Sequence, residues 1–119
     1  MKKVYIAAPL GGDVPGNIDR AMEYAEYVFK CGAAPVVPHF YALILDDSDP
    51  AQRELGMKAA RSLLWFCDEV FVFGETVSRG MKAEIKLAKA LNIKIRYFGR
   101  RNKTIKSGGS EFYEKKKGF

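Results

Sequence analysis

The residues best placed to do chemistry lie between Ser78 and Glu84. An apolar run at 70–73 and a turn at 74–76 precede them, and a helical pattern at 81–91 follows. This order predicts a strand, a turn and a helix, and open α/β sheets bind ligands at such turns, beyond the carboxyl ends of their strands. The unpaired N–H groups of the first helical turn favour an anion there.

Glu84 supplies a carboxylate beside this expected anion site. It lies about a turn and a half into the predicted helix, so its side chain can face the same cleft. Gly80 allows a ligand to approach the backbone closely. An anion cradle beside a carboxylate suits a sugar phosphate. A helix capped by Ser78 or Thr76, with Glu84 on the surface, explains the same spacing, and the sequence leaves both interpretations open.

Strand-like and helix-like segments alternate along the chain. We expect strands at 3–8, 33–37, 68–73 and 93–98, and helices at 17–31, 50–66 and 81–91. This alternation predicts an α/β fold, a Rossmann-like or flavodoxin-like three-layer sandwich. Right-handed crossovers then give a four-stranded parallel sheet in the order 2-1-3-4. The ligand crevice would open between the loops at 9–16 and 74–80.

Single residues refine these elements. Asn17 is the expected N-cap of the first helix, and Asp49 followed by Pro50 is expected to begin the second. Pro35 predicts that the second strand is an edge strand or begins at this residue. The alternating pattern of the last strand suits an edge as well.

Positive charge is concentrated at the C-terminal end of the chain, which has a net charge of +6. Residues 1–98 hold 13 Lys and Arg against 12 Asp and Glu, whereas residues 99–119 hold 7 against 2. We therefore expect one domain at 1–98 and a basic tail at 99–119, flexible at 107–110, with Phe112, Tyr113 and Phe119 available to dock. The tail has no recognisable nucleic-acid module, so we do not expect nucleic acid as a partner.

The composition favours one compact domain in a reducing compartment. The chain has 119 residues, of which 48% are hydrophobic. Cys31 and Cys67 lie in apolar surroundings without pairing or metal spacing, which predicts buried thiols. The apolar stretch after Lys3 is too short for a signal peptide, and no run approaches the roughly 20 residues of a membrane helix. We expect a cytoplasmic protein without membrane contact.

Common cofactor and metal motifs are absent from the sequence. The glycines at 11, 12 and 16 do not have the spacing of a dinucleotide fingerprint, and there is no Walker A lysine. His39 is the single histidine, so no His/Cys cluster indicates a metal, and no nucleophile elbow is present. We therefore expect neither a cofactor nor a metal.

Three motifs in this order resemble the nucleoside 2-deoxyribosyltransferase-like superfamily. They are Val4-Tyr5-Ile6-Ala7-Ala8-Pro9-Leu10, Cys67-Asp68-Glu69-Val70 and Ser78-x-Gly80-x-x-x-Glu84-Ile85. The resemblance covers about residues 3–98, and a small branch with the signature Gly-Met-x-x-Glu-Ile is most similar. The superfamily includes 2-deoxyribosyltransferases and nucleoside 5′-monophosphate N-glycosidases.

The resemblance implies roles for several residues. Glu84 matches the nucleophile that attacks the anomeric carbon, and Tyr5 matches the tyrosine that orients this carboxylate. Ser78 and Gly80 match the turn that contacts phosphate. Apart from the resemblance, His39 follows the second strand on the cleft side, so it is a candidate to donate a hydrogen bond to a base or a phosphate, and a structural hydrogen-bonding role explains a lone histidine after a proline equally well. Further substrate or phosphate contacts are expected from Met81, Pro9, Gly11 and Arg79.

One position departs from the family pattern. Family enzymes carry an aspartate eight residues before the equivalent of Asp68, and this chain has Ala60 there. Asp68 itself begins a strand, at the end of the sheet away from the cleft, so we expect it to be structural. A second carboxylate would have to come from the acidic turn or the helix after it. The candidates are Asp46, Asp47, Asp49 and Glu54.

Two functions are therefore open for this chain, with a nucleoside or nucleotide as the small-molecule partner. It is either an N-glycosidase or deoxyribosyltransferase acting through Glu84, or a domain of the same fold that binds a nucleotide or sugar phosphate without cleaving it. The resemblance also implies a homo-oligomer, with Tyr24, Trp65 and Phe66 as interface candidates. Phe40 and Tyr41 are expected near the cleft, where they could stack on a base.

Overall fold

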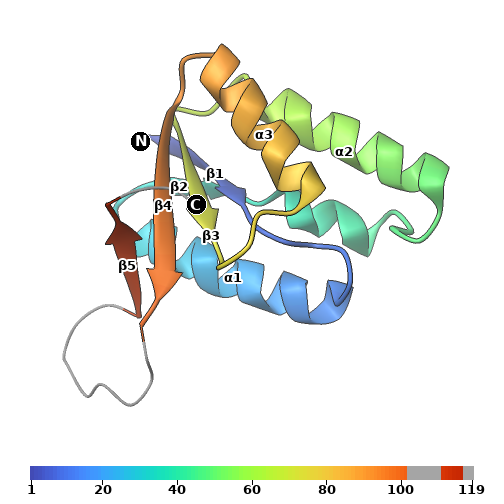
Figure 1. The fold of residues 1–119 in the computed structure, drawn as a ribbon, viewed down its shortest axis with the longest axis horizontal. Helices are drawn as coiled ribbons and strands as arrows, with labels where there is room; N and C mark the ends of the chain where they lie inside the picture. The colour runs from blue at the N-terminus through green and yellow to red at the C-terminus, as the bar shows by residue number, and fades with distance from the viewer. Residues whose placement is uncertain (102–110, 117–119) are drawn as a thin grey trace.

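The structure is a computed structural model that describes residues 1–101 and 111–116. Figure 1 shows a central sheet covered by helices. The elements are β1 (Lys3–Ala7), α1 (Val14–Lys30), β2 (Ala34–Val36), the 3-10 helix η1 (Pro38–Leu43), α2 (Pro50–Leu64), β3 (Glu69–Phe73), α3 (Arg79–Ala90), β4 (Lys94–Arg100) and β5 (Phe112–Lys115). The expected α/β class is confirmed.

The sheet has the order β2-β1-β3-β4-β5. The four parallel strands follow the predicted order 2-1-3-4, and β2, which contains Pro35, is an edge strand as expected. The prediction of four strands with β4 at an edge was wrong, because β5 pairs antiparallel with β4. Part of the predicted tail therefore joins the sheet. The segment at 107–110 and Phe119 lie outside the described residues.

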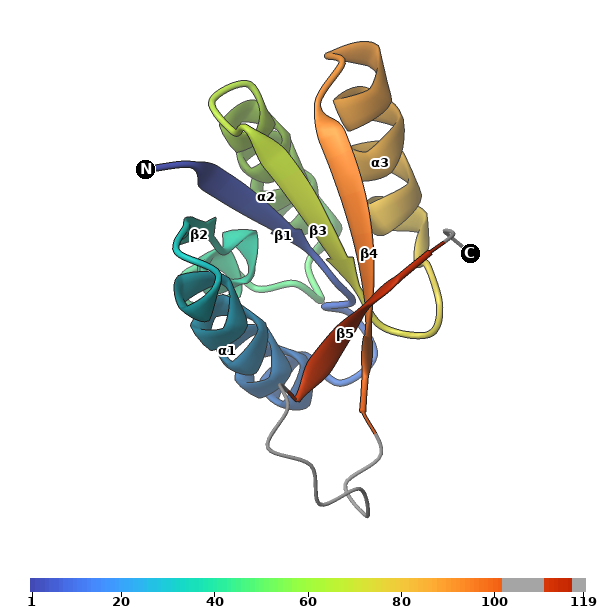
Figure 2. The same ribbon diagram turned by 90° about the vertical axis from the view of Figure 1, so that its left-hand side faces the viewer.

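The helices form layers on both faces of the sheet. Figure 2 shows α1 on one side of the strands and α3 on the other. Alternation along β1 separates the two cores: Ile6 packs with the α1 residues Ala21, Ala25 and Val28, whereas Tyr5 packs on the α2 and α3 face with residues such as Met81. The side chain of Tyr5 is therefore directed toward the helix that carries Glu84.

Aromatic rings fill the layer between α1 and the sheet. Tyr24 of α1 stacks on Phe73 of β3, with ring centroids 4.3 Å apart. Phe112 of β5 meets Tyr24, Tyr27 and Phe73 edge-on at 5.3 to 5.5 Å. Since Tyr24 is only 7% exposed, its expected role in a subunit interface is wrong. Its ring completes the core instead.

Two further sequence expectations were wrong for local reasons. Helix α1 begins one turn earlier than predicted, because Asp13 is its N-cap and accepts a hydrogen bond from the Gly16 N–H. Asn17 lies inside the helix and is buried. Cys31 is exposed after the last turn of α1, whereas Cys67 is buried as expected.

Trp65 and Phe66 lie on the surface at the C-terminal end of α2, 65% and 76% exposed. Self-association stays a prediction, with these two rings as its remaining aromatic candidates. Within residues 1–101 and 111–116, no helix has the length and apolar character needed to cross a membrane.

Candidate functional site

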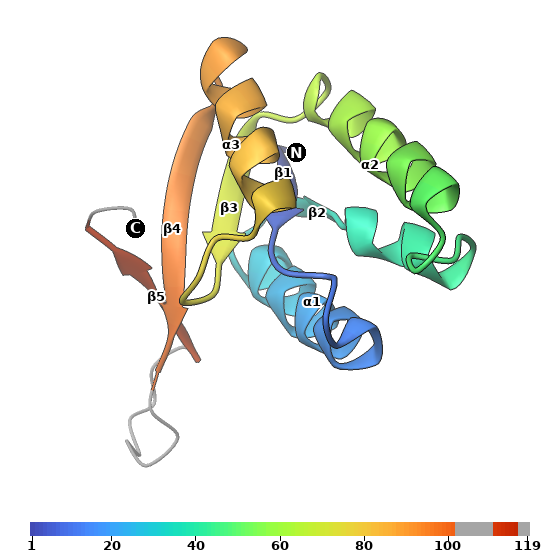
Figure 3. The same cartoon turned by 45° about the vertical axis from the view of Figure 1, so that its right-hand side comes forward.

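A cleft of about 620 Å³ lies beyond the carboxyl end of β1. Four segments surround it: the β1–α1 loop, η1 with the acidic turn after it, α2, and the start of α3. Figure 3 shows these segments converging on one end of the sheet. A parallel sheet has a crevice where the connections from two neighbouring strands leave toward opposite faces of the sheet. Here β1 is followed by α1 on one face and β3 by α3 on the other.

Glu84, which lines this cleft, is paired with the buried Tyr5. Glu84 lines the cleft from the second turn of α3, and the Tyr5 hydroxyl donates a hydrogen bond to Glu84 Oε2. Tyr5 is completely buried, and burial together with the charge of Glu84 raises the pKa of its hydroxyl. The phenol therefore stays protonated and can only donate to the carboxylate.

Burial also controls the charge of Glu84. It raises the pKa of the Glu84 carboxyl to about 7, against the opposing effects of the Tyr5 hydrogen bond and the Arg61 guanidinium. Desolvation favours the neutral acid, whereas a donor and a nearby cation favour the carboxylate. Glu84 is thus poised between its two protonation states near neutral pH, as catalytic carboxyl groups often are.

The start of α3 forms one wall of the cleft. Ser78 is the N-cap, and its Oγ accepts a hydrogen bond from the Met81 N–H at 3.3 Å. The N–H groups of Arg79 and Gly80 belong to the first turn, which has no partners within a helix. A Cβ added to Gly80 would meet nothing within 4 Å, so space is open in front of this backbone. Ser78, Arg79 and Gly80 all line the cleft.

Met81 does not belong to this wall. Its side chain is 1% exposed and packs in the core between α3 and the sheet, and its sulfur receives the Ser78 N–H at 3.5 Å. The structure therefore separates Met81 from the other predicted binding residues, because the helix directs position 81 inward.

Pro9 and Gly11 line the cleft from the β1–α1 loop. Asn17 holds this loop by donating to the Leu10 and Gly11 carbonyls at 2.8 and 3.2 Å. A Cβ added to Gly11 would lie 3.9 Å from both Arg53 Nη2 and Asp47 Oδ2. The loop, α2 and the acidic turn therefore approach one another at Gly11.

His39 lines the cleft from η1 and is only 3% exposed. Its Nε2 lies 3.0 Å from the Ala8 carbonyl oxygen. Because a carbonyl accepts and never donates, Nε2 carries a proton that the protein already uses. The expectation that His39 donates to a base or phosphate is therefore wrong for the neutral ring.

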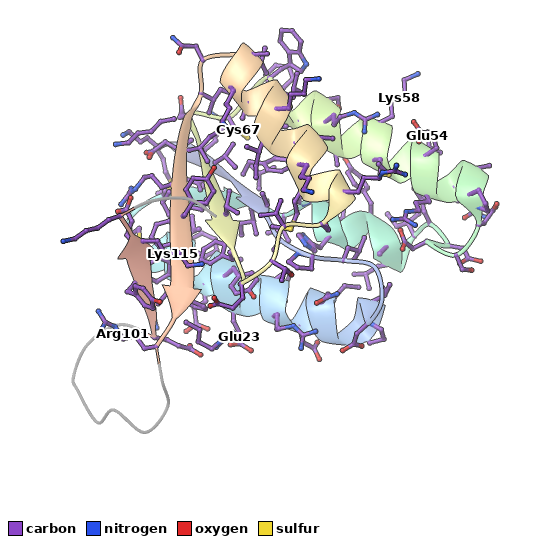
Figure 4. The ribbon with its side chains drawn as sticks, viewed as in Figure 1. Glu23, Glu54, Lys58, Cys67, Arg101 and Lys115 are labelled. Atoms are coloured by element: carbon purple, nitrogen blue, oxygen red, sulfur yellow. The ribbon has the colours of Figure 1, made fainter. Side chains whose placement is uncertain are left out.

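Ala60 lines the cleft, so the departure from the family pattern lies at the site itself. Among the candidate second carboxylates, Asp47 lines the cleft. Asp46 and Asp49 bond locally instead: Asp46 to Ser48 at 2.6 Å, and Asp49 to the Ala51 N–H at 3.3 Å as the α2 N-cap. Glu54 lies on the outer side of α2, as Figure 4 shows.

Asp68 has the structural role that the sequence predicts. Its carboxylate receives the Lys3 N–H at 2.8 Å, at the amino end of β1 and therefore away from the cleft. Tyr41 lines the cleft as a stacking candidate should, and its ring contacts that of Phe40 at 4.4 Å.

The sequence reasoning missed two cationic residues of the site. Arg53 and Arg61 line the cleft from α2, together with Met57 and Ala60. Successive members of this set are four, three and one residues apart, which places all four on one face of a helix. Since Ala60 matches a site position of the family, this spacing would have indicated the two arginines. Among the described residues, no group of His, Cys, Asp and Glu side chains is arranged to hold a metal ion.

Solved structures similar to this one include two 2-deoxyribosyltransferases. The enzyme from Bacillus psychrosaccharolyticus has a TM-score of 0.65 at 15% sequence identity, with 82% of this chain and 72% of that chain covered. The enzyme from Leishmania mexicana has a TM-score of 0.56 at 16% identity, with 85% and 66% covered. These similarities confirm the expected relationship at the level of the fold.

No curated protein matches this sequence. The profile of one protein family matches residues 2–98, which is most of the chain. The chain therefore belongs to the family described as a domain of unknown function, DUF7768.

Proposed function

We propose that this protein is an N-glycosidase or 2-deoxyribosyltransferase-like enzyme that acts on a nucleoside or a nucleoside 5′-monophosphate through Glu84. One observation carries the proposal: Glu84 accepts a hydrogen bond from the buried Tyr5 hydroxyl within a cleft that also contains the start of α3. The fold shared with 2-deoxyribosyltransferases supports it.

The chemistry follows from the ionised form of Glu84. A carboxylate oxygen attacks the anomeric carbon, the C–N bond breaks, and the base leaves with the bonding electrons and takes up a proton. The resulting glycosyl ester is opened by water or by a second base, which regenerates the carboxylate. The Tyr5 hydroxyl orients the attacking group by its hydrogen bond to Glu84 Oε2.

The start of α3 would hold the 5′-phosphate. The first-turn N–H groups, the Ser78 hydroxyl and the Arg79 guanidinium lie on one wall of the cleft, and each favours an anion. Glu84 is on the same helix, so a phosphate bound there positions the sugar relative to the carboxylate. Asp47 also lines the cleft, and in its protonated form this carboxyl group would give a proton to the departing base.

A binding domain without catalysis is the second candidate, and Ala60 favours it. The resemblance implies an aspartate at this position, whereas Ala60 lines the cleft with a side chain that has no ionisable group. Acid catalysis by a positioned group is worth about 10²- to 10⁴-fold, so its loss would leave slow turnover or none.

Substitution of Glu84 separates the two candidates. Wild-type protein, Glu84→Gln and the control Glu75→Gln are incubated with the common deoxynucleosides and nucleoside 5′-monophosphates, and released base is measured by chromatography. Glu75 is exposed in the loop before α3, so its change should be silent. Loss of the nucleophile should lower base release by about three orders of magnitude or more. Binding with no release by the wild type, unchanged in Glu84→Gln, would establish the binding domain instead.

A further inference from the structure

Arg53 is a cation of the cleft to which the proposed reaction assigns no role. It lies in the first turn of α2, lines the cleft and is exposed, so a ligand can reach it. Its Nη2 is 3.9 Å from the position that a Cβ of Gly11 would occupy, which places the charged end of the side chain beside the β1–α1 loop. Within residues 1–101 and 111–116, its guanidinium group has no hydrogen-bond or ion-pair partner.

The lining of the cleft changes in character along α2. Arg61 lies toward Glu84, because its charge favours the ionised form of that carboxyl group. Arg53 lies eight residues before Arg61, which corresponds to about 12 Å of helix. The part of α2 that lines the cleft between the two arginines is uncharged and consists of Gly56, Met57 and Ala60. This order fits a nucleoside, in which the flat rings of the base lie between the reacting sugar carbon and the polar edge of the base.

Departure of the base requires a group that stabilises negative charge. As the C–N bond breaks, its electron pair passes to the base, and the charge spreads over the ring nitrogens and carbonyl oxygens. Ala60 has no ionisable group for this step, and Asp47 assists only in its protonated form. A guanidinium group is always charged in proteins and only donates hydrogen bonds, so it stabilises an anion without losing a proton.

We propose that Arg53 donates a hydrogen bond to the departing nucleobase and stabilises the negative charge that the base acquires. This inference rests on the proposed function and adds a catalytic residue to it. A carboxylate oxygen of Glu84 forms the bond to the anomeric carbon, and the electron pair of the broken C–N bond goes to the base nitrogen. The base then takes a proton from Asp47 or from water, and Arg53 keeps its own proton throughout.

Asp47 is close enough to Arg53 for this sequence of events. Its Oδ2 lies 3.9 Å from the same Cβ position of Gly11 that Arg53 Nη2 approaches. The other two aspartates near this turn are used by the protein itself, since Asp46 binds Ser48 and Asp49 caps α2. A donor of fixed charge and a possible source of a proton therefore lie at the same end of the cleft.

The hydrogen bond from Arg53 accelerates the reaction because it becomes stronger as the base leaves. A neutral base accepts it weakly, whereas the departing anion accepts it strongly. Such a donor lowers the energy of the transition state more than that of the bound substrate. Loss of Arg53 should therefore lower kcat and change KM little.

Three variants test this inference. Arg53→Gln removes the charge and keeps a polar side chain, whereas Arg53→Lys keeps a cation without the planar guanidinium group. Lys58→Gln is the control, because it removes the same charge from the outer side of α2 (Figure 4). Since Arg53 has no partner in the described part of the chain, the melting temperature of its variants should match that of the wild type.

Matched substrates separate a role at the base from other roles. The base that the wild type releases fastest decides the pair: a purine 2′-deoxynucleoside is compared with its 7-methyl derivative, and a pyrimidine 2′-deoxynucleoside with its 5-fluoro counterpart. A 7-methylpurine is already positively charged in the nucleoside and leaves as a neutral base. Fluorine stabilises the pyrimidine anion, so both derivatives need less stabilisation by the protein.

Arg53→Gln should lower kcat for the parent nucleoside by about 100-fold, with KM within about threefold of the wild type. It should lower kcat for the derivative by less than about tenfold, and Arg53→Lys should keep part of the activity on the parent. An equal loss on parent and derivative, no loss, or a rise in KM at unchanged kcat would overturn the inference. A loss confined to the 5′-monophosphate would do so as well, because Arg53 would then bind the phosphate.

Failure of this inference is distinct from failure of the proposed function. If the wild type releases base and Glu84→Gln does not, while Arg53→Gln behaves as the wild type, only the role of Arg53 is wrong. If the wild type releases no base from any of the common deoxynucleosides or nucleoside 5′-monophosphates, the proposed function and the role of Arg53 are overturned together.

Discussion

At the scale of single residues, the site depends on how burial acts on two acids. Burial raises the pKa of Glu84 to about 7 and raises the pKa of Tyr5 as well. The two effects are compatible, since a phenol that stays protonated can donate its hydrogen bond to Glu84 whenever the carboxyl group is ionised. Arg61 opposes the effect of burial on Glu84 by favouring its charged form.

Substitution of Arg61 should therefore change the pH dependence of activity. In Arg61→Gln the cation is lost, the pKa of Glu84 rises further, and the ionised nucleophile forms only at higher pH. Base release should fall roughly threefold at pH 6 and recover at pH 9. The fold should tolerate the change, because the ion pair of Arg61 with the exposed Glu54, at 3.7 Å, is a surface interaction.

The control for this experiment is Lys58→Gln, which removes the same charge from the outer side of α2 (Figure 4). It should leave the pH profile of kcat/KM unchanged. A loss in Arg61→Gln that is equal at every pH would show that Arg61 contacts the substrate and does not act through Glu84.

At the scale of elements, the start of α3 combines a structural cap with a binding surface. Ser78 satisfies the Met81 N–H, and Met81 anchors the same turn in the core. The first turn of the helix is therefore fixed against the core by Met81, while Ser78, Arg79 and Gly80 line the cleft. This arrangement explains why Met81 matches the motif although its side chain does not reach the site.

Gly80→Ala should separate binding from stability at this element. Space is open around position 80, and alanine has the higher helix propensity, so the melting temperature should stay the same or rise slightly. Binding of a nucleoside 5′-monophosphate should weaken about tenfold if its phosphate approaches this backbone, while binding of the unphosphorylated nucleoside should change little. Calorimetry with both ligands checks this; equal effects on the two would place the phosphate elsewhere.

At the scale of the whole molecule, β5 adds a residue near the C-terminal end of the chain to the aromatic core between α1 and the sheet. Phe112 is 3% exposed and lies among Tyr24, Tyr27 and Phe73, while Arg100 lies over its ring at 4.8 Å. Arg96 of β4 pairs with Glu114 of β5 through two hydrogen bonds of 2.7 and 2.9 Å. The last strand thus covers an edge that β4 would otherwise expose.

Phe112→Ala should destabilise the protein by about 3 kcal/mol, because it leaves a cavity in this aromatic layer. Lys116→Ala is the control, since Lys116 is exposed just after β5. Chemical denaturation of both variants measures the difference in the free energy of unfolding. A Phe112 variant as stable as the wild type would mean that β5 contributes little to the fold.

Much of the fold could be predicted from local sequence, because strands, helices and their caps depend on neighbouring residues. The apolar runs indicated β1 and β3, Asp49 with Pro50 indicated the start of α2, and the glycines marked the loops. The start of α1 was misplaced because Asp13 and Asn17 are both good capping residues, and only the path of the preceding loop selects between them. The strand β5 was missed because it is defined by pairing with β4, and local sequence patterns do not show pairing between segments that are separated along the chain.

The sequence by itself determined the chemical groups and their spacing along α3: a capped helix start, a glycine and a glutamate. Only the tertiary structure brought Tyr5 of β1 to Glu84 and placed Arg53 and Arg61 in the same cleft. It also paired the His39 Nε2–H with the Ala8 carbonyl. The physical reason is that charge state and hydrogen-bond capacity depend on burial and on partners distant in sequence, whereas helix and strand patterns depend on near neighbours.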